Sequence, residues 1–568
     1  MTNVALGVLA SGPAADAVTR HVPQLVADSF ASRLFAKDPT LWGPDAQSES
    51  AVRLSWVTLG RTSRPLLGEV AALRGHLAEN GVDHVVLCGM GGSSLAPEVI
   101  CATAGVELTV LDSSNPDSVR TALTDRLDRA VVVVSSKSGS TVETDSQRRA
   151  FKDAFTRAGI DPTQRIVIVT DPGSPLDKDA RTDGYRVINA DPNVGGRYSA
   201  LTAFGLVPSG LAGVDLEQLL DEAESVADLL AEDDEANPAL RLGAAMAGTQ
   251  PLRDKLVLVD DGSGKPGFAD WAEQLIAEST GKKGTGVLPV VVQDDQDPEV
   301  HSPAAEITVA RLVADVAGID DDEATDDDDA ATGTDPSRSE VKVSGSLGAQ
   351  LLLWEVATAT AGRILGINPF DQPDVESAKK ATRGLLDATD TKPDPAAFTD
   401  GAIEVRALAG DWLAGATTVV SAVDSLLSQL DPQRGYVSIM AYLDRLADAT
   451  LAGARRTIAN RTGAPTTFGW GPRFLHSTGQ YHKGGPATGI YLQITTAPHQ
   501  DLAIPGRNFT FGDFITAQAG GDAQVLADRG RPVLRLHLTD HDAGLAQLRL
   551  ALGLDSQAGG GAGSATGA

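Results

Sequence analysis

Short aliphatic runs alternate with amphipathic stretches along the first half of the chain. The runs HVVLCGMGGSS, ELTVLDSSNP, RAVVVVSSKS and RIVIVTD begin at His84, Glu107, Arg129 and Arg165, and helix-like segments such as Ser140–Gly159 separate them. Continuous Val and Ile runs, rather than strict alternation, are typical of strands buried on both faces of a parallel sheet. Strands that alternate with helices predict a doubly wound α/β fold.

The same pattern divides the rest of the chain into regions. Helical periodicity over Ala14–Phe35 and Ala51–Leu77 predicts an N-terminal helical extension, residues 1–60, ahead of a first α/β domain, residues 61–235. A second α/β domain, residues 236–392, holds the runs KLVLVDDGSG and GTGVLPVVV and the apolar helix Leu347–Leu365. The runs YVSIMAYL, GIYLQIT and RPVLRLHL predict a C-terminal α/β region, residues 393–555. The glycine-rich end, residues 556–568, is expected to be a disordered tail.

Composition excludes several classes of protein. The 568 residues carry a formal net charge of -29, which argues against a nucleic-acid binder because such proteins neutralise phosphates. Part of that charge is the run Asp320–Asp329, interpreted as a solvated loop. No apolar run is long enough to span a membrane, and the first residues lack the basic start of a secretory signal. Only Cys88 and Cys101 occur, so we expect no disulfide framework and a cytoplasmic protein.

The first candidate site is the glycine-rich turn Gly89–Ser94, which leaves a strand and enters a helix. Glycines there let the backbone approach an anion, and a helix N-terminus offers free N–H groups. Asp112 ends the next strand at the spacing at which a dinucleotide fold places its ribose-binding acid. Ser94 stands where that fingerprint has its third glycine, so a dinucleotide site is an open but weaker alternative.

The second candidate site is the turn SSKSGST, residues 135–141, which follows VVVV and precedes a helix. Hydroxyls, backbone N–H groups and a lysine at a strand-to-helix turn suit a terminal phosphate. Helix capping would also explain serines and threonines at this position. Two such turns on neighbouring strands favour a phosphate site, for which we select six residues: Gly92, Ser93, Ser136, Lys137, Ser138 and Thr141.

The third candidate site is the predicted helix in FADWAEQLIAESTGKK, which begins at Phe268 and is expected to end at Gly281, in the left-handed conformation. Gln274 and Glu278 lie one turn apart and share a face. The negative pole of the helix dipole disfavours a charged carboxylate at this end, which would raise the pKa of Glu278 towards that of a general base. On this stretch alone, an exposed helix-end glutamate is the favoured interpretation.

These motifs together resemble a known family. VLCGMGGSSLAP followed by VVSSKSGSTVET resembles the sugar isomerase (SIS) domain, a phosphosugar-binding α/β fold, and implies that both central domains are SIS-type. DPNVGGRYSALTAFG, around Arg197, QLIAESTGK, around Glu278, and NPFDQPDVESAK, from Gln372 to Lys379, resemble three signatures of phosphoglucose isomerases in the family's order. The segment GPRFLHSTGQYHKGGP is similar to the isomerase half of bacterial transaldolase–glucose-6-phosphate isomerase fusions.

The resemblance implies the interconversion of glucose 6-phosphate and fructose 6-phosphate through a cis-enediolate, without metal or organic cofactor. Glu278 would be the base, and Arg197 would stabilise the enediolate charge, brought close by Gly195 and Gly196. Lys379 would contact the ring oxygen or O1. The amides of two glutamines would orient hydroxyls or loop backbone: Gln274 and Gln372.

Ring opening is the step for which the sequence departs from the family. Family members use a histidine, often from the neighbouring subunit, but the corresponding helix here carries Gln350. His476 and His482 lie in the segment FLHSTGQYHKGG and are the preferred candidates, whereas His301 follows an acidic segment and is interpreted as a surface residue.

Two alternative functions and the oligomeric state stay open on sequence grounds. A non-catalytic SIS protein would sense a sugar phosphate with the two turns alone, without Arg197, Glu278 and Lys379. A dual isomerase would act on both glucose and mannose phosphates with the same base. The resemblance implies a homodimer, although the additional domains could cover the dimer face.

Overall fold

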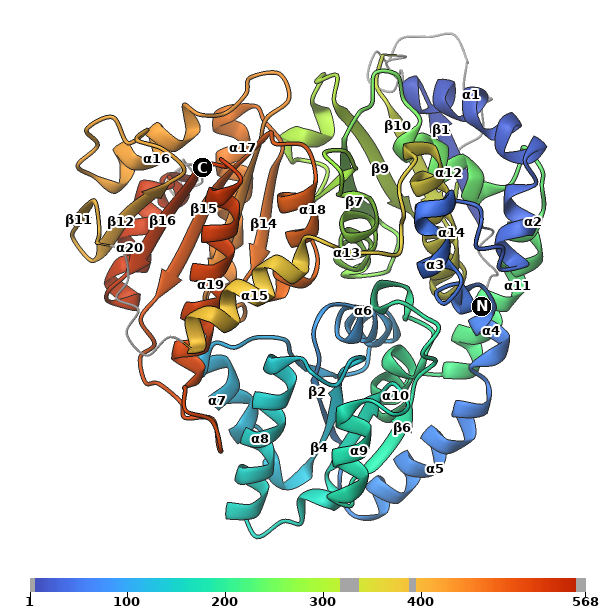
Figure 1. The fold of residues 1–568 in the computed structure, drawn as a ribbon, viewed down its shortest axis with the longest axis horizontal. Helices are drawn as coiled ribbons and strands as arrows, with labels where there is room; N and C mark the ends of the chain where they lie inside the picture. The colour runs from blue at the N-terminus through green and yellow to red at the C-terminus, as the bar shows by residue number, and fades with distance from the viewer. Residues whose placement is uncertain (1–5, 317–336, 388–394, 558–568) are drawn as a thin grey trace, which may run out of the picture.

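The computed structural model describes residues 6–316, 337–387 and 395–557. Each of its three lobes is built on one sheet, and the lobes meet around a common centre (Figure 1). The acidic run Asp320–Asp329 and most of the predicted tail lie outside the described residues. The α/β class with parallel sheets, predicted from the alternating pattern, is confirmed.

The first lobe holds a five-stranded sheet in the order β3-β2-β4-β5-β6, with every neighbouring pair parallel. Its strands are β2 (His84–Cys88), β3 (Thr109–Leu111), β4 (Ala130–Ser135), β5 (Ile166–Thr170) and β6 (Arg186–Asn189). Its helices are α5 (Pro65–Glu79), α6 (Leu95–Ala104), α7 (Pro116–Thr124), α8 (Val142–Arg157), α9 (Pro175–Thr182) and α10 (Ala203–Ala212). Strands β2, β4 and β5 are buried at every position, which explains their unbroken Val and Ile runs.

The second lobe holds a sheet in the order β1-β10-β9-β7-β8, antiparallel only at β1. Its strands are β1 (Gly7–Ser11), β7 (Lys255–Asp261), β8 (Leu288–Val291), β9 (Ile307–Val313) and β10 (Glu340–Ser344). Its helices are α11 (Leu216–Ala231), α12 (Pro238–Ala247), α13 (Phe268–Thr280) and α14 (Leu347–Leu365). The predicted helix Leu347–Leu365 is therefore confirmed.

The start of the chain differs from the predicted helical extension. Strand β1 pairs with β10, so the N-terminus contributes an edge strand to the second sheet before its helices begin. Those helices are α1 (Pro13–Ala27), α2 (Phe30–Phe35), α3 (Pro44–Ser50) and α4 (Leu59–Thr62). A five-residue edge strand that is only partly buried gives too short a run to detect from hydrophobicity.

The third lobe holds a mixed sheet in the order β11-β12-β16-β15-β13-β14. Its strands are β11 (Phe398–Asp400), β12 (Ile403–Leu408), β13 (Tyr436–Tyr442), β14 (Thr466–Trp470), β15 (Gly489–Thr496) and β16 (Val533–Leu538). Its helices are α16 (Val419–Leu427), α17 (Ala454–Thr462), α18 (Gly479–Gly484), α19 (Phe511–Asp528) and α20 (His541–Ala551). The predicted strands β13, β15 and β16 are confirmed. Helix α15 (Val375–Asp387) leaves the second lobe and packs along α19 (Figure 1).

The third lobe is joined to both other lobes. One hydrophobic cluster combines Val257 and Leu288 of the second sheet with Tyr436, Met440 and Phe474 of the third lobe. Towards the first lobe, the guanidinium of Arg473 contacts Glu98 and Asp112, each at 2.5 Å. Asp112 is thus paired with an arginine of the third lobe. This pairing argues against the ribose-binding role that we considered for Asp112. The C-terminal lobe is therefore an integral part of the molecule.

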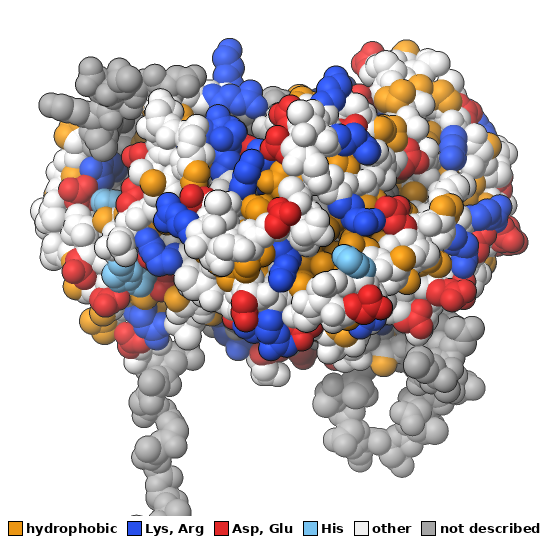
Figure 2. Space-filling view, turned by 90° about the horizontal axis from the view of Figure 1, so that it is seen from below, with side chains coloured by type: hydrophobic (Ala, Val, Ile, Leu, Met, Phe, Trp, Pro, Cys, Tyr) orange, Lys and Arg blue, Asp and Glu red, His pale blue; other side chains and the backbone are white. Residues whose placement is uncertain are grey.

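Surface charge is mixed rather than concentrated on the face seen in Figure 2. There, Lys and Arg side chains are interspersed with Asp and Glu side chains. Across the described residues, no helix has both the length and the apolarity needed to cross a bilayer.

Candidate active site

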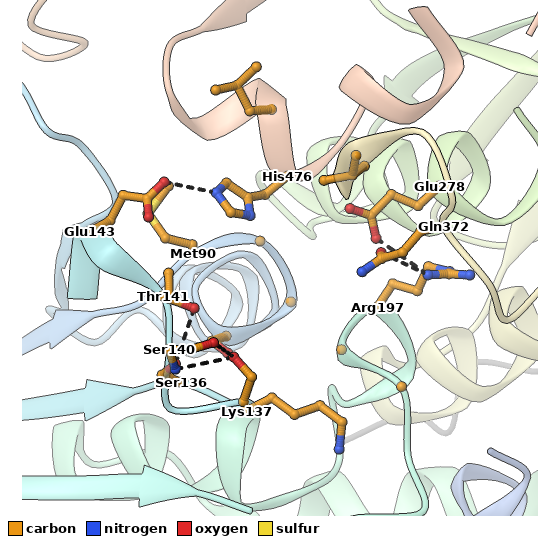
Figure 3. Close-up of a pocket in the computed structure, with 18 of the residues that line it drawn as sticks. Met90, Ser136, Lys137, Ser140, Thr141, Glu143, Arg197, Glu278, Gln372 and His476 are labelled. Carbon is orange, nitrogen blue, oxygen red and sulfur yellow. Dashed lines mark hydrogen bonds and ion pairs between the residues drawn. The ribbon is translucent and has the colours of Figure 1, made fainter. Parts of the chain in front are cut away.

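A pocket of about 730 Å³ lies where the three lobes meet. Its walls come from the two glycine- and serine-rich turns of the first lobe, the turn that carries Arg197, helix α13, the segment before α15, and the third lobe (Figure 3). The turns follow β2 and β4, so the pocket opens at the carboxyl ends of parallel strands, where α/β sheets bind ligands.

A cluster of hydroxyls lines one side of this pocket. Ser136 Oγ donates to Thr141 Oγ1 at 3.1 Å, and Ser138 Oγ lies 2.9 Å from Ser140 Oγ. Helix α8 begins at the next residue, Val142, and directs its first N–H groups towards the same turn. Hydroxyls and a helix N-terminus at one place form a site suited to phosphate.

Lys137 lines the pocket but is already paired. Its Nζ donates to Asp171 Oδ2 at 2.6 Å and to the carbonyl of Pro192 at 3.3 Å, and Figure 3 shows its chain leading away from the hydroxyls. Burial lowers the pKa of Lys137 and raises the pKa of Asp171. The lysine that we selected for its charge therefore anchors the turn, and its charge is balanced by Asp171.

The glycine-rich turn lies against the turn that carries Arg197. A Cβ carbon at Gly92 would lie 2.0 Å from the carbonyl oxygen of Gly196, and Gly91 has a φ of +57°. By contrast, a Cβ carbon at Gly196 would meet no atom within 4 Å. We attributed the close approach of the two turns to Gly195 and Gly196, but it depends on the missing side chain of Gly92. Ser93, the next residue, also lines the pocket.

Arg197 is buried, and its guanidinium is fixed on several sides. Nε donates to Ser279 Oγ at 2.8 Å, and Nη2 donates to the carbonyls of Pro369 and Asp371 at 2.6 and 2.9 Å. Nη1 donates to Gln372 Oε1 at 3.3 Å and lies 3.7 Å from Glu278 Oε2. These contacts hold a positive charge beside the carboxylate before any substrate binds.

Glu278 and Gln274 extend from the last turns of α13 into the pocket. Both are buried, and within the described residues Gln274 Oε1 has no hydrogen-bond partner. A buried amide oxygen without a partner is costly unless a ligand hydroxyl satisfies it. Gly281 ends the helix with a φ of −76°, not in the left-handed conformation that we predicted. A Cβ carbon there would lie 2.5 Å from Tyr481 Cα, so close packing against α18 requires this glycine.

Lys282 fixes the segment opposite α13. Its Nζ donates to the carbonyl of Asn368 at 2.8 Å, and to the carbonyl and carboxylate of Asp371 at 2.6 and 2.7 Å. Burial and the nearby Arg197 lower the pKa of Lys282 to about 8, although Asp371 opposes that shift. The lysine therefore holds the loop that carries Gln372.

The two candidate histidines lie in different environments. His476 lines the pocket, and its Nε2 lies 3.2 Å from Glu143 Oε1, which also accepts a hydrogen bond from Gln518 Nε2 at 2.7 Å (Figure 3). His482 lies outside the pocket, buried between the Tyr436 hydroxyl at 3.0 Å and Ser438 Oγ at 3.2 Å. Burial lowers its pKa well below the ordinary value. Our selection of His482 is therefore corrected: it packs within the third lobe.

The remaining sequence candidates are placed as follows. The side chain of Lys379 lies outside the described residues, although Thr382 and Arg383 from the same helix line the pocket. Gln350 is fully buried away from the pocket, where its Oε1 accepts from Trp354 Nε1 at 3.3 Å. His301 is exposed at the surface, as we expected.

Sequence reasoning missed Glu143, Gln518 and Lys282. Glu143 follows the phosphate turn by two residues, and Lys282 belongs to the segment around Glu278, so both stood within recognised motifs. Gln518 gave no signal, because 375 residues separate it from its partner Glu143.

Comparisons with known proteins give the following matches. The phosphoglucose isomerase family profile matches residues 69–247. A probable glucose-6-phosphate isomerase of Haloarcula marismortui is 30% identical over 357 residues, covering 54% of this chain and 79% of that protein. One of Natronomonas pharaonis is 32% identical over 340 residues, with the same coverage. Among solved structures, a hypothetical protein of Thermus thermophilus is similar at a TM-score of 0.54 and 25% identity, covering 67% of this chain and all of that chain.

Proposed function

The chain belongs to the phosphoglucose isomerase family, and on this premise we propose which of its residues interconvert glucose 6-phosphate and fructose 6-phosphate. The observation that carries the assignment is the pair formed by Glu278 and Arg197, whose Oε2 and Nη1 atoms lie 3.7 Å apart in the pocket. A base beside a fixed cation suits a reaction in which a proton leaves carbon and negative charge develops on a neighbouring oxygen.

The phosphate of the substrate binds at the hydroxyl turn, residues 136–141. Four hydroxyls and the first N–H groups of α8 surround it there. Thr382 and Arg383 of α15 also line the pocket, and the exposed guanidinium of Arg383 supplies positive charge. Binding the phosphate away from Glu278 leaves the other end of the open-chain sugar to reach the carboxylate.

Glu278 then transfers one proton between two carbons. Its carboxylate removes the proton from C2 of glucose 6-phosphate, the electrons of that bond form the C1–C2 double bond, and the carbonyl π electrons move to O1. Arg197 stabilises the resulting charge on O1, and a proton passes from O2 to O1. Return of the proton from Glu278 to C1 gives fructose 6-phosphate. One carboxylate that reaches both C1 and C2 is sufficient for the reaction in either direction.

The side chains of two glutamines and one lysine orient the sugar or the loop beside it. Gln274 Oε1 accepts a hydrogen bond from a sugar hydroxyl, which satisfies an atom that is otherwise buried without a partner among the described residues. Gln372 accepts a hydrogen bond from Arg197. Lys379 contacts the ring oxygen or O1 by the family resemblance alone.

His476 is the proposed ring-opening group. Nε2 of its ring contacts Glu143, which also accepts a hydrogen bond from Gln518, so the imidazole is oriented. Nδ1, for which no hydrogen bond to another described residue is seen, then exchanges a proton with the sugar. His476 and Gln518 belong to the third lobe, whereas Glu143 belongs to the first. A single chain therefore supplies both His476 and the two residues that orient it.

The test is a coupled assay in which fructose 6-phosphate conversion drives nicotinamide reduction by glucose-6-phosphate dehydrogenase. We expect turnover by the wild type and a raised KM with little change in kcat for Ser138→Ala combined with Thr141→Val, because phosphate contacts act in the ground state and the transition state alike. An inactive wild type that binds sugar phosphates would favour a sensor. Turnover of mannose 6-phosphate in the same assay would show the dual isomerase.

Three finer assignments accompany this function. We propose a homodimer, a cytoplasmic location, and kinship with the isomerase half of transaldolase–isomerase fusions through residues 471–486. The assembly is measurable by light scattering on the eluting protein. A monomer with full activity would exclude a dimer as a requirement for catalysis.

A further inference from the structure

Two imidazoles and a carboxylate converge outside the pocket, where the third lobe meets the first. His499 lies in the loop that follows β15, and His541 and Asp542 begin α20. Asp542 Oδ1 lies 2.9 Å from His541 Nδ1 and 3.7 Å from His499 Nε2, and the two ring centroids are 4.8 Å apart. One nitrogen of each ring therefore faces the same carboxylate.

The opposite nitrogen of each ring is held by a second carboxylate. His541 Nε2 lies 3.1 Å from Asp448 Oδ1, and His499 Nδ1 lies 3.4 Å from Asp117 Oδ2. Asp448 is only 3% exposed, so the orientation of the His541 ring is fixed from the interior. A carboxylate behind an imidazole selects its tautomer and increases its basicity, an arrangement typical of histidines that ligate metals.

We propose that His499, His541 and Asp542 bind a divalent transition-metal ion of the Zn²⁺ class through Nε2, Nδ1 and Oδ1. In a tetrahedral zinc site, bonds of about 2.0–2.2 Å place ligand atoms about 3.3 Å apart. The distances of 2.9 and 3.7 Å lie on either side of that value.

The local charges favour a cation in spite of the helix. The N-terminus of α20 is the positive end of its dipole and opposes a metal ion. Asp540 offsets that end, because its side chain accepts the N–H of Ala543 as the helix N-cap. Asp448 contacts His541 and Asp117 contacts His499, and Asp117 is also paired with Arg120 at 3.3 Å. Imidazole ligands select zinc, nickel or copper rather than magnesium or calcium, and three protein ligands leave a fourth position for water.

The ion would join α20 to a segment that contacts the first lobe. The loop after His499 accepts hydrogen bonds from Arg120 at the carbonyls of Gln500 and Asp501. Further along, Arg507 donates to Asp145 of α8 at 2.7 Å. None of the three ligands lines the isomerase pocket. Metal binding is therefore expected to raise the thermal midpoint of the chain and to leave turnover unchanged.

Calorimetric titration of the chelator-treated full chain with Zn²⁺ at about pH 7.5 tests the site. We expect one equivalent bound by the wild type and a loss of about 100-fold or more in affinity for His499→Ala combined with Asp542→Ala. Both side chains are exposed, so this variant is expected to fold and to keep its isomerase activity. Asp448→Asn, which keeps all three ligands, should weaken binding by about 10- to 100-fold.

His301→Ala is the matched control, because His301 is an exposed histidine that faces one carboxylate, Asp295, at 3.5 Å. We expect its zinc affinity and its metal-dependent thermal shift to equal those of the wild type. Absence of binding by the wild type at millimolar Zn²⁺ would overturn the proposal. Equal affinity in the wild type and in the His499→Ala/Asp542→Ala variant would overturn it as well.

Discussion

Replacing Gly92 by alanine tests whether the contact between the two turns positions Arg197. The new Cβ carbon would lie 2.0 Å from the carbonyl oxygen of Gly196, and carbon–oxygen contacts of this kind rarely fall below about 3 Å. The nearest atoms are the carbonyl group of Gly196 and the backbone nitrogen of Arg197, which cannot rotate away as a side chain could. One of the two turns must therefore move by about 1 Å. Arg197 follows Gly196 directly, and its guanidinium moves with that turn relative to the phosphate site.

A displacement of about 1 Å at a reacting centre costs about 100-fold in rate, which corresponds to about 2.7 kcal/mol of transition-state stabilisation. We therefore expect kcat/KM for fructose 6-phosphate in the coupled assay to fall by about 100-fold in Gly92→Ala. Gly75→Ala in α5 is the control, because a Cβ carbon there meets no atom within 4 Å. It should keep full activity and gain about 0.5–1 kcal/mol of stability. Wild-type kcat/KM in a folded Gly92→Ala protein would refute the reasoning.

Three further substitutions test the pocket and its surroundings. His476→Ala should lower kcat about 100-fold on cyclic glucose 6-phosphate but little on an open-chain substrate, and equal losses on both would contradict a ring-opening role. His482→Ala should instead lower the free energy of unfolding by about 2–4 kcal/mol, measured in urea, with turnover retained, because the ring packs between buried hydroxyls. Burial lowers the pKa of Lys282 to about 8, so its ammonium loses its proton as the pH rises through 8. The ion pair with Asp371 is then lost, and activity should decline in this pH range. Lys282→Arg stays charged and should move that alkaline limb upward, and an unmoved limb would assign it to another group.

Local sequence predicted the parts of the fold and site that depend on local structure. Strands β2, β4 and β5 are buried on both faces and therefore read as unbroken aliphatic runs. The hydroxyl turn and the Gln274–Glu278 pair lie within single segments, so residue spacing alone brings their groups together. Strands at or near sheet edges, such as β1, β6 and β11, are short and partly exposed, and their patterns are too weak to detect.

Contacts between distant segments were not predictable in the same way. The hydrogen bond from His476 to Glu143 joins residues 333 positions apart, and nothing in either segment specifies the other. The same limit applies to Lys137: its charge is visible in the sequence, but its pairing with Asp171 is not. His476 and His482 lie six residues apart in one motif, and only tertiary packing places one in the pocket and the other in the core.

Proton transfer by Glu278 is the central claim, and the exchange of substrate hydrogen with solvent deuterium, followed by NMR, tests it most directly. Glu273→Gln is the control on the same helix, because burial raises the pKa of Glu273 to about 8 and a neutral amide resembles its protonated form at neutral pH. Glu278→Gln should lower exchange and isomerisation by about 1,000-fold or more with substrate affinity retained, whereas Glu273→Gln should stay within about threefold of wild type. Near-wild-type exchange in Glu278→Gln would contradict the account.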